Sequence, residues 1–226
     1  QNTAFGRSSL YSNTTGSRNT ASGQESLKSN TEGDKNTASG YNSLYANTTG
    51  DENTAFGTHS MRYNTTGSGN TASGTQSLYL NTTGNSNTAS GYYSLYSNTT
   101  GASNTASGYE SLKSNTTGTR NIAIGYKAYD AADTEDDNLA IGYDALGGAI
   151  DGGEYNIAIG NYSLDANTTG DFNLGIGHDA LTASTTGGSN IAHGYRSLYK
   201  NTEGDRNIAV GVASLFENLT GNFNVA

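Results

Sequence analysis

The sequence predicts an all-β protein, a parallel β-solenoid of short coils, and three observations lead to this fold class. First, Asn recurs every 17 residues from Asn2 to Asn138 and, after one interval of 18, from Asn156 to Asn224. Second, most units carry the turn motif Asn-Thr-Thr-Gly. Third, no unit has a helical hydrophobic period, and Thr, Asn, Ser and Gly are poor helix formers. A unit this short cannot bury a core alone, so the units must stack.

The residue type at each position of the unit, counted from the Asn at position 1, indicates a particular local structure. The consensus is N-T/I-A-x-G-Y-x-S-L-Y-x-N-T-T-G-x-x, as in "NTASGYESLKSNTTGTR" at 104–120. Stacked Asn side chains at position 1 can form a hydrogen-bonded ladder. Positions 2–4 and 8–10 are each long enough for a short strand, which predicts two strands per coil. Gly at position 5 indicates a tight bend or a close backbone approach. Asn-Thr-Thr-Gly at positions 12–15 matches a type I turn.

The composition excludes several classes of protein. The 226 residues include 31 Gly, no Pro and no Cys, are 32% hydrophobic and carry a net charge of -9. Low hydrophobicity alone is typical of disorder, but the strict period favours a solenoid. Only 11 Lys and Arg against 20 acids argues against nucleic acid as a partner. We find no segment of membrane-spanning length and no cofactor motif. Because Gln1 ends one unit and the last three residues begin another, we expect the chain to be part of a longer array.

Side-chain alternation predicts which residues face inward. Position 3 is Ala in every unit except at Gly175, and position 9 is almost always Leu. We therefore expect positions 3 and 9 to fill the coil and positions 2 and 4 to face outward. The opposite assignment, with positions 2 and 4 as core, remains open at this point. It would place His193 and the serines of position 4 in the interior.

The outward positions divide the chain into two continuous parts. In residues 1–120 most units read T-A-S-G, whereas residues 121–226 read I-A-I-G or similar. An exposed aliphatic stripe of this length exceeds what monomers usually tolerate, so we expect it to be covered by other copies of the chain. The predicted oligomer interface consists of Ile122, Ile124, Leu139, Ile141, Ile157, Ile159, Leu174, Ile176, Ile191, Ile208 and Val210.

The segments "NIAIGYKA", "NLAIGYDAL" and "NIAIGNYSL" resemble the head repeats of YadA-like trimeric autotransporter adhesins. The whole unit is also similar to repeats of phage tail-fibre and bacterial surface proteins that end in an endosialidase-type chaperone domain. This resemblance implies a left-handed β-roll, three chains side by side, an extracellular location on a cell surface or virion, and adhesion or spacing as the function. The unit of 17 residues is longer than the usual adhesin-head unit.

Two groups of residues are candidate ligand contacts. Exposed aromatic rows can stack on sugar rings or pack between coils, so possible glycan contacts are Tyr41, Tyr45, Tyr92, Tyr96 and Tyr109. The repeat is broken by "DAADTEDD" at 130–137 and by "DGGEY" at 151–155, which stacking should place one rung apart. These acids can fan into water or share Ca²⁺, the metal candidates being Asp136, Asp137, Asp151 and Glu154.

We find no catalytic constellation, because His59, His178 and His193 stand at different positions of separate units and no Cys accompanies them. The leading hypothesis is a non-enzymatic structural or adhesive module of an extracellular fibre, assembled as a trimer or filament, with a surface glycan or host receptor as a further partner. One alternative is binding of ice or another regular surface by the Thr and Ser array. Another is a phage tail-spike module that binds or hydrolyses glycans with carboxylate pairs.

Overall fold

Each 17-residue coil contributes one strand of three residues, and no helix is present. The computed structural model of the protein describes all residues, 1–226, and divides into unit 1 (1–117) and unit 2 (118–226). The strands of unit 1 are β1 (Thr3–Phe5), β2 (Thr20–Ser22), β3 (Thr37–Ser39), β4 (Thr54–Phe56), β5 (Thr71–Ser73), β6 (Thr88–Ser90) and β7 (Thr105–Ser107). Those of unit 2 are β8 (Ile122–Ile124), β9 (Leu139–Ile141), β10 (Ile157–Ile159), β11 (Leu174–Ile176), β12 (Ile191–His193) and β13 (Ile208–Val210).

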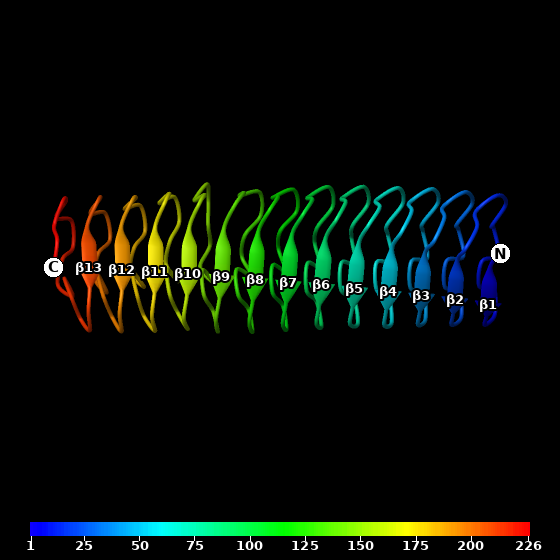
Figure 1. Cartoon of the computed structure of the whole chain (residues 1–226), viewed down its shortest axis with the longest axis horizontal. Helices are drawn as coiled ribbons and strands as arrows, with labels where there is room; N and C mark the ends of the chain where they lie inside the picture. The colour runs from blue at the N-terminus through cyan, green and yellow to red at the C-terminus, as the bar shows by residue number, and fades with distance from the viewer. The chain divides into compact units, whose positions relative to one another are not determined.

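Within each unit the strands pair in parallel, in chain order and in register (Figure 1). In unit 1, for example, Thr88 pairs with Thr105, and in unit 2 Ile141 pairs with Ile159. Residues at the same repeat position therefore form columns along each unit, spaced by about 4.8 Å, the ordinary distance between hydrogen-bonded strands. The predicted parallel β-solenoid with a 17-residue repeat is confirmed.

The prediction of a second strand at positions 8–10 is wrong. Residues at positions 7 and 9 adopt the left-handed region of the backbone, as in Glu25 (φ 59°) and Leu27 (φ 48°). This conformation is incompatible with a β-strand, although the coils still bond to one another here, since Leu27 N donates to the carbonyl of Ser43 at 3.0 Å. The segment turns the chain and points the side chain of position 9 into the coil.

The core of each unit is a narrow stack of small residues and leucines. In unit 1, Ala38 and Leu44 are completely buried, as are Ala158 and Leu164 in unit 2. The strands show the matching pattern, with position 3 buried and positions 2 and 4 exposed or half-buried in β2–β13. The predicted assignment of inward and outward faces is thereby confirmed, and the opposite assignment is wrong.

Two Asn ladders connect the coils. At position 1, the backbone N–H of Asn36 donates to Oδ1 of Asn19 at 2.8 Å, while Asn19 Nδ2 donates to the carbonyl of Gly33 at 2.7 Å. At position 12, Asn30 Nδ2 donates to Oδ1 of Asn13 at 2.9 Å and to the same Gly33 carbonyl at 3.0 Å. The ladder at position 1 was predicted, whereas the sequence indicated only a turn at position 12. Both buried amides are satisfied by bonds within and between coils.

The second ladder is interrupted in unit 2 at Ser184, which stands where most coils have Asn. As a result, the buried Oδ1 of Asn167 in the preceding coil has no hydrogen-bond partner. In the following coil, Asn201 Nδ2 donates to its own turn, at the carbonyl of Gly204. A restored Asn at position 12 would supply the missing donor and accept a bond from Asn201.

We therefore expect Ser184→Asn to stabilise the protein by about 1 to 2 kcal/mol, because it satisfies a buried acceptor and adds a second bond. The midpoint of urea unfolding should rise. Ser184→Asp is the matched control, since it has the same shape but no amide donor for Asn167. Equal stability of the Asn and Asp variants would show that the ladder bonds are not the source of the effect.

Candidate functional site

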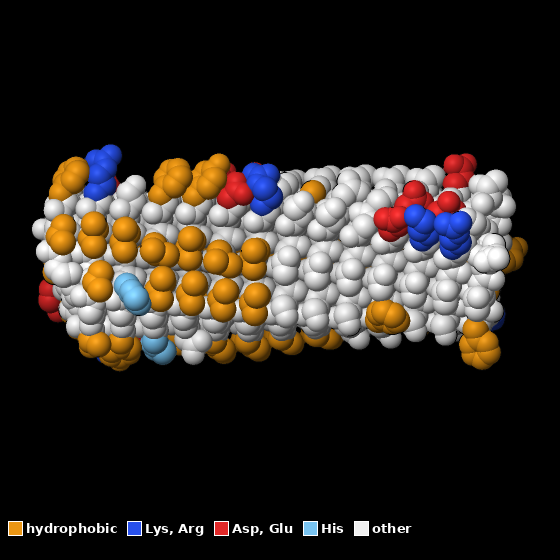
Figure 2. Space-filling model, in the orientation of Figure 1, with side chains coloured by type: hydrophobic (Ala, Val, Ile, Leu, Met, Phe, Trp, Pro, Cys, Tyr) orange, Lys and Arg blue, Asp and Glu red, His pale blue; other side chains and the backbone are white.

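The most extensive unusual surface is the apolar face of unit 2, formed by positions 2 and 4 of its six strands. Six of its eleven aliphatic side chains are exposed, with exposed fractions from 37% to 59%, and the others are half-buried. Figure 2 shows these side chains as two parallel rows of hydrophobic atoms, interrupted in one row by a histidine. Because the strands are in register, each row repeats at the spacing of the coils. All predicted interface residues thus lie on one outward face.

An aromatic row at positions 6 and 7 borders this apolar face. Tyr126 and Tyr143 stack at 5.1 Å between ring centroids with an angle of 5°. The row continues through edge contacts of Tyr162 with Tyr143 and His178, and ends at Tyr195. The four tyrosines of this row are exposed, which widens the hydrophobic surface of unit 2 beyond its strands.

The face that positions 2 and 4 form in unit 1 is polar. Thr occupies position 2 in all seven strands, and Ser occupies position 4 except at Phe5 and Phe56. Their side chains are exposed or half-buried, so the face offers two columns of hydroxyl groups to solvent. A hydroxyl-lined face can remain hydrated without a partner, in contrast to the face of unit 2.

The predicted glycan-contact tyrosines contact neighbouring rings or cations, and Tyr41, Tyr92 and Tyr109 are nevertheless exposed. Tyr92 stacks on Tyr109 at 5.6 Å and 13°, and Tyr96 stacks on Tyr79 at 5.0 Å and 8°. The rings of Tyr41 and His59 form a T-shaped contact, and the cations of Lys28 and Arg62 lie over the ring of Tyr45. A contact with Tyr93 raises the pKa of Tyr92 to about 12, so its phenol is neutral at physiological pH. These contacts pack coil against coil, and contact of the exposed rings with a glycan stays a prediction.

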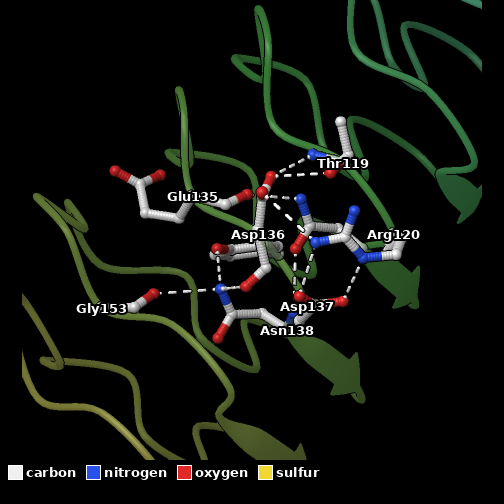
Figure 3. A network of polar contacts seen from close by, with 9 residues as sticks. Thr119, Arg120, Glu135, Asp136, Asp137, Asn138 and Gly153 are labelled. Atoms are coloured by element: carbon white, nitrogen blue, oxygen red, sulfur yellow. Dashed lines mark hydrogen bonds and ion pairs between the residues drawn. The ribbon is translucent and has the colours of Figure 1, made fainter.

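The acidic segment at 130–137 is neutralised in part by Arg120 (Figure 3). The guanidinium forms a bidentate pair with Asp137, at 2.6 and 2.7 Å, and approaches Asp136 at 3.4 Å. Asp136 also accepts hydrogen bonds from the backbone N–H and the hydroxyl of Thr119. The hydrogen bond from Arg120 lowers the pKa of Asp137 below its ordinary value. Both predicted metal candidates in this segment are therefore occupied by protein donors.

The same coil carries a buried group that the sequence analysis missed. Tyr129 replaces the Leu of position 9 and is completely buried, and burial raises the pKa of its phenol well above the ordinary value. Its hydroxyl accepts a hydrogen bond from Asn138 Nδ2 at 2.6 Å. Ala132 and Glu135 stand where most coils have Asn and Gly, and both are buried. The signal that could have revealed this group is the simultaneous change of positions 9, 12 and 15 in one unit.

The inserted loop of the next coil stacks on the acidic segment, as predicted from the repeat. Gly152 N donates to the carboxylate of Glu135 at 3.2 Å, and Asp133 N donates to the same carboxylate at 3.0 Å. Asp151 is exposed, and the backbone N–H of Glu154 donates to Asp171. No group of three or more His, Asp or Glu side chains lies close enough together to hold a metal ion. The four metal candidates are thus near one another in the stack but do not converge.

Burial and the charges of Asp136, Asp171 and Asp137 raise the pKa of Glu154 above its ordinary value. A carboxyl whose pKa is raised on folding destabilises the fold when it is ionised. We expect Glu154→Gln to stabilise the protein at pH 7, by less than about 1 kcal/mol because the group is partly exposed. The gain should disappear as the pH falls below the unfolded-state pKa, where Glu154 is protonated in both states. Urea unfolding at pH 7 and pH 3 measures this difference, with exposed Glu203→Gln as the control.

The three histidines are not brought together into a catalytic group. His59 contacts Tyr41 and Tyr79, and burial together with Arg62 lowers its pKa. His178 lies in the aromatic row of unit 2, and His193 lies on the apolar face. No helix is long and apolar enough to cross a membrane.

The fold and these surfaces define the chain as a repeat protein of the β-solenoid class. No family model matches it, and neither a curated protein nor a solved structure is significantly similar to it. Function must therefore be argued from the surfaces themselves.

Proposed function

We propose that the chain is a non-enzymatic structural and adhesive module of an extracellular fibre, in which copies pack side by side through the apolar face of unit 2. The observation that carries this proposal is the outward direction of that face. Its aliphatic residues belong to an otherwise complete coil whose core is already filled by Ala and Leu. They add nothing to the interior, so their burial must come from a second surface.

A second copy is the partner that fits this face best. The face is in register and periodic, and an identical face offers the same period to pack against it. The resemblance to YadA-like head repeats supports three chains around a common axis and an extracellular location. The polar face of unit 1, the surface tyrosine rows and the acidic charge would remain in contact with solvent or with the target of adhesion.

The native mass in solution tests the proposal. Static light scattering on the full chain should give an oligomer, with three copies as the expected number. A stable monomer across a wide concentration range would contradict side-by-side assembly.

A further inference from the structure

The surface of unit 2 has one hollow that the apolar face and the acidic segment do not account for. It opens at the coil that contains Gly188 and Ser189, at positions 16 and 17. The walls come from the coils before and after, and the lining residues are Thr169, Asp171, Phe172, Thr186, Asp205 and Arg206. Small side chains in one coil and large ones in its two neighbours create the hollow.

The hollow is a gap in a stacked column at position 17. On one side, Tyr155 and Phe172 stack with 5.0 Å between centroids and an angle of 2°. On the other side, the guanidinium of Arg206 lies over the ring of Phe223 at 5.3 Å. Ser189 lies between these two pairs, and its small side chain leaves most of the space at its coil empty. Figure 2 shows a corresponding interval along the upper rim, between hydrophobic side chains and a basic one.

The gap has the dimensions of one six-membered ring. Phe172 and Arg206 are two coils apart, so their levels differ by about 9.6 Å, twice the strand spacing. A ring at the level of Ser189 would lie at about 4.8 Å from each of them, close to the 5.0 Å that Tyr155 and Phe172 keep. The free face of Phe172 is accessible, because 59% of this side chain is exposed.

Polar groups surround this open ring face. Asp171 and Asp205 each use Oδ1 to accept a backbone N–H, from Glu154 and Gly188, which leaves Oδ2 of both available. Arg206 forms no salt bridge, so its guanidinium donors are also available. The hydroxyls of Thr169 and Thr186 lie at the same opening. An apolar ring face beside carboxylate acceptors and guanidinium donors suits a ligand that is apolar on its faces and hydroxylated at its edge.

We propose that this ring slot, formed by Phe172, Ser189 and Arg206 with Asp171 and Asp205 at its edge, binds a single pyranose ring of a neutral glycan. The C–H face of the sugar packs on Phe172, and its hydroxyls donate to the aspartates and accept from Arg206. Two carboxylates against one guanidinium disfavour an acidic sugar. The inference deepens the proposed adhesive function by naming its ligand class, and it assigns the contact to residues other than the stacked tyrosine rows.

The test uses the full chain labelled with ¹⁵N and titrated with methyl glucoside, methyl galactoside, methyl N-acetylglucosaminide and methyl glucuronide. We expect at least one neutral sugar to shift the amide signals of Gly188 and Arg206 in a saturable manner, and the glucuronide to bind more weakly. Phe172→Ala should weaken binding about fivefold or more, because the stacking partner is lost. Ser189→Tyr should abolish binding, because the new ring fills the slot as Tyr155 fills its own level.

Ser86→Tyr is the matched control. It places the same ring at position 17 of unit 1, where Phe172 and Arg206 have no counterparts, and binding should be unchanged. Absence of any saturable shift, or full binding by Ser189→Tyr, would overturn the ring slot. The two proposals can fail independently. If the protein is a monomer and binds sugar, only the proposed assembly is wrong. If it is an oligomer and binds no sugar, only the proposed ring slot is wrong.

Discussion

Replacing Ile141 and Ile159 together with Asp is expected to convert the proposed oligomer into monomers. The two residues are paired in register at position 4 of β9 and β10, in the middle of the apolar face. In an assembly each would be buried against another copy, where an aliphatic side chain contributes about 1.5 to 3 kcal/mol. Two carboxylates without partners in that contact would cost several kcal/mol more. Light scattering should report the mass of one chain, while far-ultraviolet circular dichroism should keep its β-type spectrum.

The matched control is the pair Ser90→Asp and Ser107→Asp in unit 1. These residues are also paired in register at position 4, so the control introduces the same two charges one rung apart. Because their face is polar, the mass should stay that of the parent protein. Dissociation of both double variants would trace the effect to charge repulsion along the stack, and dissociation of neither would show that the apolar face does not hold the copies together.

The period and the inward face could be predicted because each depends on residue size at fixed positions. Only Ala or Gly occurs at position 3, where the coil leaves room for a methyl group, and Leu or a similar side chain occurs at position 9. The identity of the outward residues followed from this by alternation. The apolar face of unit 2 was therefore predictable residue by residue.

The backbone at positions 7 and 9 could not be predicted from local preference. Ser-Leu-Tyr favours an extended strand, and a left-handed conformation costs a residue such as Leu44 about 1 to 2 kcal/mol. The observed geometry offsets that cost by burying the Leu side chain completely and by bonding its N–H to the next coil at 3.0 Å. Contacts between coils decide this conformation, and the sequence of a single unit does not reveal them.

The group around Tyr129 illustrates a second limit. Each change in that coil looks like surface variation when taken alone, since Ala132 and Glu135 occupy turn positions. In the folded coil these residues lie close together. Ala132 lacks the Asn side chain that fills the turn in other coils, and Tyr129 occupies the core. The carboxylate of Glu135 accepts hydrogen bonds from three backbone N–H groups. Such a compensation becomes visible only when positions far apart in one coil are placed side by side.

Gly40→Ala is expected to destabilise unit 1 by about 3 kcal/mol or more. Gly40 stands at position 5 with φ +133°, a conformation that residues with a Cβ rarely adopt. A Cβ there would lie 2.5 Å from the carbonyl oxygen of Gly57 in the next coil, which is backbone and cannot move aside without breaking the stack. Because each coil contacts only its neighbours, the damage should be centred on the coils of β2 to β4. Urea unfolding measures the loss, and hydrogen exchange should locate it.

Gly69→Ala provides the control within the same unit, because it adds the same methyl group at a glycine with a left-handed conformation and free space around it. Gly69 has φ +67°, and its nearest neighbour to an added Cβ is Ser86 Oγ at 3.8 Å. The same repeat position is held by Lys35 and Glu52 with φ of 57° and 58°, so the fold accommodates a side chain there. We expect a cost of about 1 kcal/mol or less. A much larger loss at Gly40 is expected, because its φ of +133° and its contact with the next backbone both require glycine at position 5, whereas similar losses for the two variants would contradict that special requirement.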